Sequence, residues 1–598
     1  MKNNLLLLLP GTIVALAAAP AAGQNYAGLA LSNYAGTNAA YTNPSAIADS
    51  RHRYYLQLVG AEASFYSTYL QLNLRQRPWQ AEFSMERRDL AEQGGSGPHA
   101  GSFSGEARLP SLLLTLGPHS AVAFSSRGRG FVQASNVSDN LARLAYHGLD
   151  EAQQLGLANH LLEDNSFNLS VNTYHEFALT YARVVGRSSR HFWKAGLTAK
   201  YLVGLGSAYV LNDGTTYQVY GRDSLQLQTR QLSYGATDYR LYGQRGFTVS
   251  SLYGGQQLGG GYGADLGLTY EYRPDYATYN YHLDGRDQVD RTRNKYRLRL
   301  GLALTDLGAL TYDNAQHVRQ GQLANAKTVQ LGHLDTLNFR TLAQGENTLE
   351  RLTGLSSRGH AFTSYLPAAL RLTADYHVAG PLYAGALWVQ NLLPARTIGS
   401  RSVSTLALVP RLELRRLELA LPVQLLGNYR QVAAGAMLRL GPLVLGSDNL
   451  GGLLGLRTAT GADFYFGLSL AGQHRRPKDR DHDGVSNKHD QRHRQKGTWE
   501  NKGCPEPAPL PAVSAAAPVP AVPDSLSAVP AAAAPAPAAP ASLPPSPALP
   551  AATPTLPDSA PAAPVPAAPA LTPIIPAPAP ATPNPGPQAP APRSSGRW

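Results

Sequence analysis

Alternation of apolar and polar side chains is the strongest pattern in the chain, and it is clearest in YRLRLGLAL, residues 296–304. Tyr296 and four leucines occupy one set of alternate positions, whereas Arg297, Arg299 and two small residues occupy the other. Successive side chains of a strand point to opposite faces, and two arginines cannot lie unpaired in an apolar core. A soluble sandwich could carry one such strand at its surface. A membrane barrel needs many, with lipid outside and a polar lumen inside.

The same alternation recurs along the body of the chain. It is repeated in ADFYFGLSL (462–470) and LRLTADYH (370–377), and more weakly in LGLTYEYR (266–273) and LTAKYLV (197–203). LELRRLELAL (412–421) alternates within each half, and its phase slip at Arg415–Arg416 predicts a bulge or a tight turn. Glu413 and Glu418 lie beside arginines, as ion pairs on the lumen side would. Together these segments predict an all-β protein, a transmembrane antiparallel β-barrel.

The two ends of the chain have different compositions from this body. Residues 1–23 contain Lys2, an apolar run and then small residues, which predicts a signal peptide cleaved before Gln24. No later apolar run approaches the roughly 20 residues of a spanning helix, so a membrane protein of this sequence must close its strands into a barrel. Of 45 prolines, 30 lie in residues 505–598, which predicts a disordered, extended Pro/Ala-rich tail.

Residues 24–472 therefore form the predicted barrel, long enough for some 12 to 16 strands. Within it, residues 138–164 change to helical periodicity and predict either an extracellular loop or an element inside the lumen. The signal peptide, together with Cys504 as the single cysteine, places the protein in the outer membrane of a Gram-negative bacterium, with a periplasmic tail.

The net charge of +12 does not indicate nucleic-acid binding, because the basic residues are scattered and the chain is exported. Anionic lipid head groups of the outer membrane are the expected partner for this charge.

A linker, residues 473–504, contains one metal-like motif. In KDRDHDGVSNKHD the candidate ligands stand at positions 1, 3, 5, 7, 9 and 12 of a calcium loop: Asp479, Asp481, Asp483, Val485 through its carbonyl, Asn487 and Asp490. Gly484 supplies the sharp turn at position 6. The other interpretation is a solvated acidic turn, since the surrounding lysines and arginines oppose cation binding by Coulomb repulsion. Bound Ca²⁺ would stiffen the linker rather than perform chemistry.

No set of residues indicates an enzyme. The chain has neither a G-x-S-x-G elbow nor an H-E-x-x-H motif. Gly259-x-Gly261-x-x-Ala264 imitates a dinucleotide fingerprint but precedes a predicted strand instead of joining strand to helix. We therefore expect a protein without catalytic activity.

Several segments carry a resemblance to known families. Residues 440–467 contain LGP, GSDNLGG and ADFYFG, which, with LALTDLG (302–308), YLPAAL (365–370) and GADLGL (263–268), resemble an outer-membrane barrel family of Bacteroidota, domain of unknown function 5723. Asn43-Pro44-Ser45 is similar to a stretch of FadL-type fatty-acid transporters and their PorV-like relatives. That likeness implies about 14 antiparallel strands and an N-terminal plug, with residues 24–50 as a hatch.

The linker resembles the thrombospondin type 3-like calcium repeats of OmpA-type proteins. It departs from them at Arg492-His493, where the family carries Cys-Pro, so Cys504 has no disulfide partner. In OmpA-type proteins a peptidoglycan-binding domain follows such a linker, whereas here the Pro/Ala-rich tail follows it. The resemblance therefore does not by itself predict that this protein contacts the cell wall.

Two functions remain open at this point. The first is passive transport of a small hydrophobic or amphipathic molecule, which predicts a plugged lumen, an apolar pocket and a lateral opening where a strand is interrupted. The second is a non-transporting envelope or secretion-associated scaffold that recruits periplasmic partners through its tail. An apolar pocket would favour transport, and a lumen sealed by ion pairs would favour the scaffold.

Overall fold

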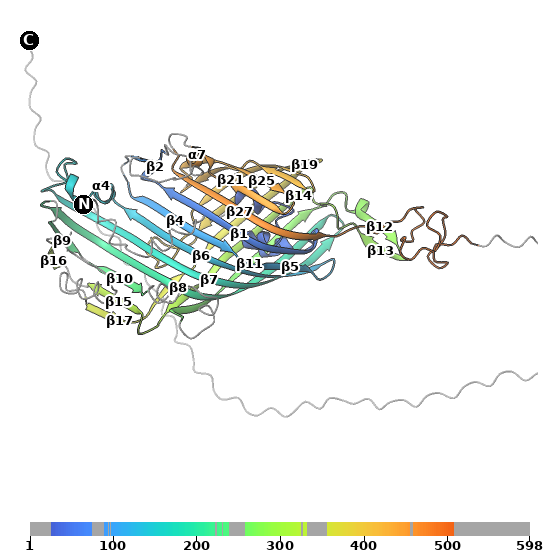
Figure 1. Ribbon diagram of the computed structural model, residues 1–598, viewed down its shortest axis with the longest axis horizontal. Helices are drawn as coiled ribbons and strands as arrows, with labels where there is room; N and C mark the ends of the chain where they lie inside the picture. The colour runs from blue at the N-terminus through green and yellow to red at the C-terminus, as the bar shows by residue number, and fades with distance from the viewer. Residues whose placement is uncertain are drawn as a thin grey trace, which may run out of the picture. The chain divides into compact units, whose positions relative to one another are not determined.

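The computed structural model describes residues 26–73, 89–93, 95, 97–221, 224–229, 231–238, 257–323, 327–331, 356–427, 429–454 and 459–506. The predicted signal peptide and nearly all of the predicted tail lie outside the described residues, so both stay predictions. The described part is a closed antiparallel β-barrel, whose strands run obliquely along its length in Figure 1. None of the helices within the described ranges has the length and apolar character needed to span a bilayer.

Fourteen strand positions close the wall across the described residues. The last strand pairs with the first, from Gln473 opposite His52 to Gly461 opposite Tyr66. In order around the wall the strands are β1 (His52–Ser67), β4 (His99–Arg108) with β5 (Ser111–Thr115), β6 (Ser120–Val137), β7 (Leu161–Ser188), β8 (His191–Val219), β11 (Gly259–Tyr272), β14 (Leu298–Tyr312), β18 (Phe362–Tyr365) with β19 (Ala369–Ala379), β20 (Leu382–Asn391), β21 (Thr405–Glu413), β22 (Leu417–Ala420) with β23 (Val423–Leu426), β24 (Gln431–Ala434) with β25 (Ala436–Leu440), β26 (Leu443–Ser447) and β27 (Gly461–Gln473).

Three of these positions are split where a proline removes a backbone donor: Pro110, Pro367 and Pro422. The register with one neighbouring strand is unchanged across each split, whereas the pairing with β6 shifts by one residue across Pro110. Arg108 lies opposite Gly60 and Ser111 opposite Gln57, so the same spacing is kept on both sides of Pro110. Each split strand therefore stays paired with one neighbour on both sides of its proline.

The predicted alternation is confirmed on β14, β19 and β27. Leu300 and Leu302 are about two-fifths exposed on the outer face, whereas Arg299 points inward and pairs with Asp375. One detail of the prediction is wrong: Tyr296 points into the lumen and Arg297 outward. The reason is that β14 begins only at Leu298, so the two preceding residues do not share its alternation.

The two rims of the barrel differ in the length of their connections. One rim has short turns, including Arg415–Arg416, where the predicted tight turn is confirmed by the bond from Leu414 N to Leu417 O (2.7 Å). The other rim has long connections, one of which contains α4 (Asp139–His147). The helical periodicity is confirmed there, but its predicted range to residue 164 is too long, because Leu161 and Leu162 begin β7. Outer-membrane barrels have short periplasmic turns and long extracellular loops. The rim with the short turns is therefore periplasmic, and β1 begins and β27 ends there.

Shorter elements extend both rims. The extracellular rim carries η4 (Leu149–Glu151), α7 (Leu450–Leu453), the hairpin β2 (Leu70–Leu72) with β3 (Leu90–Glu92), and an extension built on β8 from β9 (Leu225–Thr229), β10 (Leu232–Thr237), β15 (Val318–Leu323), β16 (Lys327–Leu331) and β17 (Ser356–Gly359). Between β11 and β14 the periplasmic rim carries η6 (Tyr276–Tyr279) and a hairpin of β12 (Asn280–Leu283) and β13 (Arg286–Val289).

The N-terminal segment, residues 26–50, lies inside the barrel, as the FadL-type resemblance implied. We call it the plug. It contains α2 (Ala27–Ala30), α3 (Asn38–Thr42) and η2 (Pro44–Ile47). Its small residues suit a confined space, and its few large ones, such as Leu29 and Ile47, pack on apolar patches of the inner wall. Two apolar clusters of the core are therefore contacts between plug and wall, and a third, which includes Phe131, Tyr174 and Tyr312, is built from the barrel without the plug.

Candidate functional site

The tripeptide Asn43-Pro44-Ser45 anchors the plug to one side of the wall. The Asn43 side chain caps η2 by accepting from the N–H of Ser45 (2.9 Å), and Pro44 takes the first position, where no N–H is needed. The amide nitrogen of Asn43 donates to the carbonyl oxygen of Leu268 (3.0 Å), and the hydroxyls of Ser45 and Thr269 lie 2.7 Å apart. A local capping motif thus fastens the plug to β11.

Three glycines on neighbouring strands make room for this tripeptide, and we call them the glycine notch: Gly196 of β8, Gly267 of β11 and Gly301 of β14. A Cβ on Gly196 would lie 2.4 Å from the nitrogen of Ser45. A Cβ on Gly267 would lie 2.1 Å from Oδ1 of Asn43, and one on Gly301 would lie 2.9 Å from its Nδ2. Any larger residue at these positions must displace the plug.

The start of the plug is held on the opposite side of the wall by Asp448. Its carboxylate accepts the N–H groups of Ala27 and Gly28, the latter at 3.2 Å, and the hydroxyl of Tyr465 at 3.0 Å. The ring of Tyr26 lies under the guanidinium of Arg108, whose Cζ is 3.5 Å from the ring centroid. Backbone donors of the plug are therefore satisfied by a buried wall carboxylate, as buried polar groups require.

The middle of the plug bonds two wall glutamates. The hydroxyl of Ser32 donates to Glu418 (2.8 Å), and the backbone N–H of Asn33 donates to Glu413 (3.0 Å). Each glutamate also pairs with a wall arginine, Arg439 at 2.8 Å and Arg411 at 3.1 Å respectively. The predicted lumen-side ion pairs of Glu413 and Glu418 are thus confirmed, and they double as plug contacts.

The end of the plug is fixed by Asp49. Its carboxylate lies 2.8 Å from Arg273 of the connection after β11 and 3.0 Å from Lys295 before β14. Arg273 also contacts Glu271, which in turn pairs with Lys194 at 2.6 Å. Contacts at Asp448, Glu418, Glu413, β11 and Asp49 together tie the plug to strands around the circumference of the wall.

A second group of charges fills the lumen beside the plug, and we call it the lumenal charge cluster. Arg127 lies 3.0 Å from Glu106 and 2.9 Å from Glu176. Asp306 pairs with Arg129 (3.0 Å) and Lys200 (2.6 Å). The cluster also includes Glu62, Asp265 and Arg108. These side chains are almost fully buried, which is tolerable only because each charge has an opposite partner.

The cavities between plug and wall are small and polar. One of about 80 Å³ is lined by charged side chains that include Asp49, Lys194, Glu271 and Arg299. Another, of about 20 Å³, lies between the plug and the lumenal charge cluster. Between plug and wall the described part of the lumen is therefore filled by charged side chains. A larger cavity of about 510 Å³, lined by residues such as Gln133, Ser170 and Gln390, lies toward the extracellular rim.

In the linker, three of the predicted calcium ligands come together. Carboxylate oxygens of Asp479, Asp481 and Asp483 lie within 4.8 Å of one another. Among the described residues, these three side chains form a group that could hold a metal ion. Asp479 accepts the N–H groups of His482 (2.9 Å) and Gly484 (3.0 Å), the latter with a φ of 87°. The turn that glycine was predicted to allow is present.

The carboxylate of Asp481 differs from those of its neighbours. Both of its oxygens are shielded from solvent, yet neither accepts a hydrogen bond. Local burial and the negative charge of Asp483 raise the pKa of Asp481 above its ordinary value. Carboxylate oxygens are among the ligands that hard cations accept in proteins.

Of the other three predicted ligands, Asp490 lies outside this group of carboxylates, and the Val485 carbonyl and Asn487 stay predictions. The Asn487 side chain accepts the N–H of Arg480 (3.0 Å), and the Val485 side chain is fully buried. Asp490 is buried, accepts the N–H of Arg492 (2.7 Å) and lies 3.4 Å from His493. These residues shape the loop around the three aspartates.

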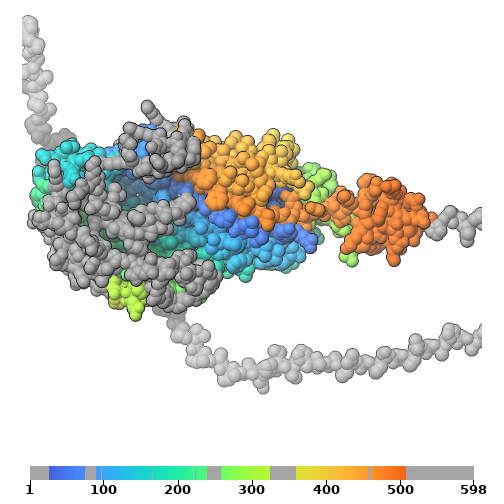
Figure 2. Space-filling view, viewed as in Figure 1, coloured from blue at the N-terminus to red at the C-terminus, as the bar shows by residue number. Residues whose placement is uncertain are grey.

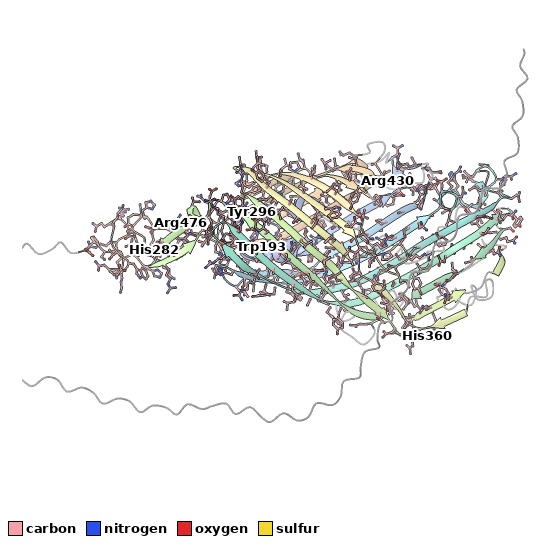
Figure 3. The ribbon with its side chains drawn as sticks, turned by 180° about the vertical axis from the view of Figure 1, so that it is seen from behind. Trp193, His282, Tyr296, His360, Arg430 and Arg476 are labelled. Atoms are coloured by element: carbon pink, nitrogen blue, oxygen red, sulfur yellow. The ribbon has the colours of Figure 1, made fainter. Side chains whose placement is uncertain are left out.

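The linker packs against the β12–β13 hairpin, and Figure 2 shows the two in contact at one end of the molecule. Asp284 at the hairpin turn accepts the N–H (2.7 Å) and the hydroxyl (2.9 Å) of Ser486. Arg476 lies over the ring of Tyr281 at 4.3 Å, near the labelled His282 (Figure 3). Partial burial raises the pKa of Asp284, but the bonds from Ser486 and the contact with His489 outweigh it and hold the pKa below its usual range.

Sequence reasoning missed this hairpin, the glycine notch and most of the lumenal charge cluster. A local signal for the hairpin exists, because Asp284-Gly285 stands between alternating residues and both have positive φ. No local signal exists for the notch or for the pairing of residues such as Arg129 and Asp306, which lie on distant strands.

Comparison with known proteins finds one family and several distant solved structures. The model of the family of unknown function DUF5723 matches residues 44–448. No curated protein matches the chain significantly. Among solved structures, the deltaS2 mutant of the TodX monoaromatic hydrocarbon channel is 8% identical with a TM-score of 0.34, covering 74% of this chain and 95% of that one.

A Pseudomonas aeruginosa FadL homologue is 11% identical with a TM-score of 0.20, covering 75% of this chain and 98% of that one. The translocator domain of the autotransporter NalP from Neisseria meningitidis is 8% identical with a TM-score of 0.25, covering 70% and 87%. These likenesses are too distant to assign a function. The family match covers more than half of the chain, and the protein therefore belongs to the DUF5723 family of unknown function.

Proposed function

We propose that this protein is a closed outer-membrane scaffold that holds the linker and its tail at the periplasmic rim, rather than an open channel. The carrying observation is the plug, which is bonded to strands around the wall within a lumen filled by ion pairs. Of the two functions left open by the sequence, this is the one that a sealed lumen favours.

The charges of the lumen support the closed state. A path through the lumen would have to separate buried ion pairs such as Arg127 with Glu176 and Lys200 with Asp306. Removing one partner of a buried pair leaves an uncompensated charge and costs about 3 to 5 kcal/mol. Spontaneous opening would therefore be rare.

Packing of the linker against the hairpin supports a presenting role. The bonds between Asp284 and Ser486 hold the linker at the rim, so the following tail would start from a defined point. A Pro/Ala-rich tail can reach partners at a distance with weak, repeated contacts. A periplasmic protein or the cell wall is the proposed class of partner.

We also propose that the linker binds Ca²⁺ through Asp479, Asp481 and Asp483, as a brace without catalytic chemistry. Carboxylate oxygens are the ligands that this hard cation prefers. The unbonded oxygens of Asp481 support the proposal. Bound calcium would offset the repulsion among the three carboxylates and stiffen the loop that meets the hairpin.

Flux through the reconstituted barrel tests the proposal. Liposomes containing the wild type should take up a small neutral sugar and a fluorescent fatty acid no faster than empty liposomes. Uptake of the fatty acid above that background would support passive transport of a hydrophobic molecule and contradict the scaffold. Native mass spectrometry of protein from its own membrane adds a second readout, because a small lipid-like cargo in the lumen would also contradict it.

A photo-crosslinker placed in living cells tests the presenting role. At Lys488, an exposed linker position, it should yield one defined envelope protein, whereas the lipid-facing Leu302 position serves as the control. A linker position that gives the same products as Leu302 would contradict recruitment.

A further inference from the structure

A cavity of about 980 Å³ opens at the periplasmic rim, where β27 closes on β1. It is lined by the start of β1, the turn before β6, the turns at 415–416 and 441–442, and the residues that follow β27. Tyr34 of the plug and the first residues of the linker, Gln473–Arg475, also line it, whereas the β12–β13 hairpin does not. Its position at the rim places it at the level of the lipid head groups of the periplasmic leaflet.

The lining of this rim cavity is strongly basic and contains no acidic side chain among the described residues. Its six arginines are Arg53, Arg291, Arg415, Arg416, Arg439 and Arg475. Arg439 is neutralised by Glu418 at 2.8 Å. Within the described part of the chain the other five arginines have no carboxylate within ion-pair distance. Two of them make neutral hydrogen bonds: Arg291 donates to the carbonyl of Gly117 (2.8 Å), and Arg415 donates to the side chain of Gln473 (3.2 Å). The cavity therefore carries several uncompensated positive charges.

Buried polar groups at the cavity also lack partners. His52 is 2% exposed, and neither of its ring nitrogens makes a hydrogen bond. The Nε atom of Arg291 and the Nε2 atom of His474 are buried without a bond as well. Burial and the charges of Arg291 and Arg53 lower the pKa of His474 to about 4. Buried donors in native proteins are normally satisfied, so these groups indicate an anionic ligand.

The outer edge of the cavity is apolar. Leu470 on β27 is 50% exposed and Leu116 is 63% exposed on the lipid-facing side of the wall. Tyr54 lies flat over Gly472 of the neighbouring strand, where a Cβ would come within 2.2 Å of its ring. The arginines and this apolar edge together match a molecule with an anionic head and a hydrocarbon tail. A free anion would contact only the arginines.

We propose that the rim cavity binds an anionic phospholipid of the periplasmic leaflet, with its phosphate among the arginines and its acyl chains along Tyr54, Leu116 and Leu470. Arginine suits phosphate because its planar group donates two parallel hydrogen bonds. The bound lipid would sit at the seam where the first and last strands meet. This inference does not depend on the scaffold function.

Native mass spectrometry of the detergent-solubilised full chain tests the proposal, with phosphatidylglycerol, phosphatidylcholine and inorganic phosphate as probes. We expect phosphatidylglycerol to be retained on the wild type in preference to phosphatidylcholine. Arg416→Gln with Arg475→Gln removes two exposed cavity charges and should weaken retention about twenty-five-fold, since each basic residue near an anionic lipid contributes roughly a factor of five.

The matched control is Arg190→Gln, an exposed arginine of the β7–β8 turn on the same rim. An equal loss in this control would overturn the site, because it would show that only the total surface charge matters. Retention of inorganic phosphate without phosphatidylglycerol would also overturn it. Heat-modifiable migration on a gel verifies that each variant is still a folded barrel, and unchanged retention in the folded double variant would equally contradict the proposal.

Discussion

Asn43 of the plug occupies the space that Gly267 of β11 leaves empty, so closely that a Cβ on the glycine would lie 2.1 Å from Oδ1 of the asparagine. The two residues are 224 positions apart in the chain and meet only because the plug lies inside the closed wall. We therefore expect the position of the plug to depend on the absence of a side chain at 267.

Gly267→Ala should loosen the plug while leaving the wall intact. Real Cβ contacts do not fall below 3 Å, so the alanine must push Asn43 away, at a cost of about 1 to 3 kcal/mol for overpacking. Single-channel conductance should rise from the closed level of the wild type to frequent open events. The matched control is Gly128→Ala on β6, where a Cβ would meet its nearest atom at an ordinary 3.9 Å. Equal conductance of the two variants would contradict the closed-plug interpretation.

Arg127→Gln should destabilise the barrel strongly. The change leaves Glu106 and Glu176 without one of their partners in a buried environment, and breaking a buried pair costs about 3 to 5 kcal/mol. The midpoint of urea unfolding in lipid vesicles measures the effect. Arg187→Gln on the exposed end of β7 should change that midpoint little, and a similar midpoint for both variants would show that the lumenal charge cluster does not stabilise the fold.

Asp284→Asn should release the linker from the hairpin. The amide loses the charge that accepts the N–H and hydroxyl of Ser486, so hydrogen exchange across residues 479–490 should become faster. Asp287→Asn on the same hairpin is the control, because that side chain is 93% exposed. Faster exchange in both variants would mean that general charge loss, not this contact, is responsible.

The same contact should depend on pH. The pKa of Asp284 is held below its usual range in the packed state, so its ionisation contributes stability above the ordinary aspartate pKa of about 3.9. That contribution is lost as the pH falls through the lowered value. Protection of the linker in hydrogen exchange should therefore be constant near neutrality and decrease only in acid. Loss of protection already between pH 6 and 7 would contradict the assignment of this pH dependence to Asp284.

Calcium should protect the linker loop, and Asp481→Asn should remove that protection. The raised pKa of Asp481 means that protons compete with the cation at a higher pH than at an ordinary aspartate, so affinity should fall as the pH is lowered. Isothermal titration of the full chain measures the binding, with Asp287→Asn as the control variant. Binding that survives in Asp481→Asn would contradict the assignment of this carboxylate as a ligand.

The sequence by itself determined the architecture, because the signals for it are local. Alternation on Leu298–Tyr312 or Gly461–Gln473 needs only the period of a strand, and the slip at Arg415–Arg416 needs only a turn. The charge pattern also showed that Glu413 and Glu418 belong on the lumen side. The phase of Tyr296 and Arg297 was wrong because alternation ends where the strand ends, and the sequence does not mark that boundary sharply.

Only the tertiary structure decided which residues meet across the lumen. Barrel closure and strand register bring Arg129 to Asp306 and Asn43 to Gly267, and neither pair is encoded by any spacing along the chain. The rim cavity likewise exists because β27 returns to β1 and gathers arginines from distant turns. Period-two patterns specify a face for each side chain, whereas ion pairs and cavities depend on register and closure, which involve the whole sheet.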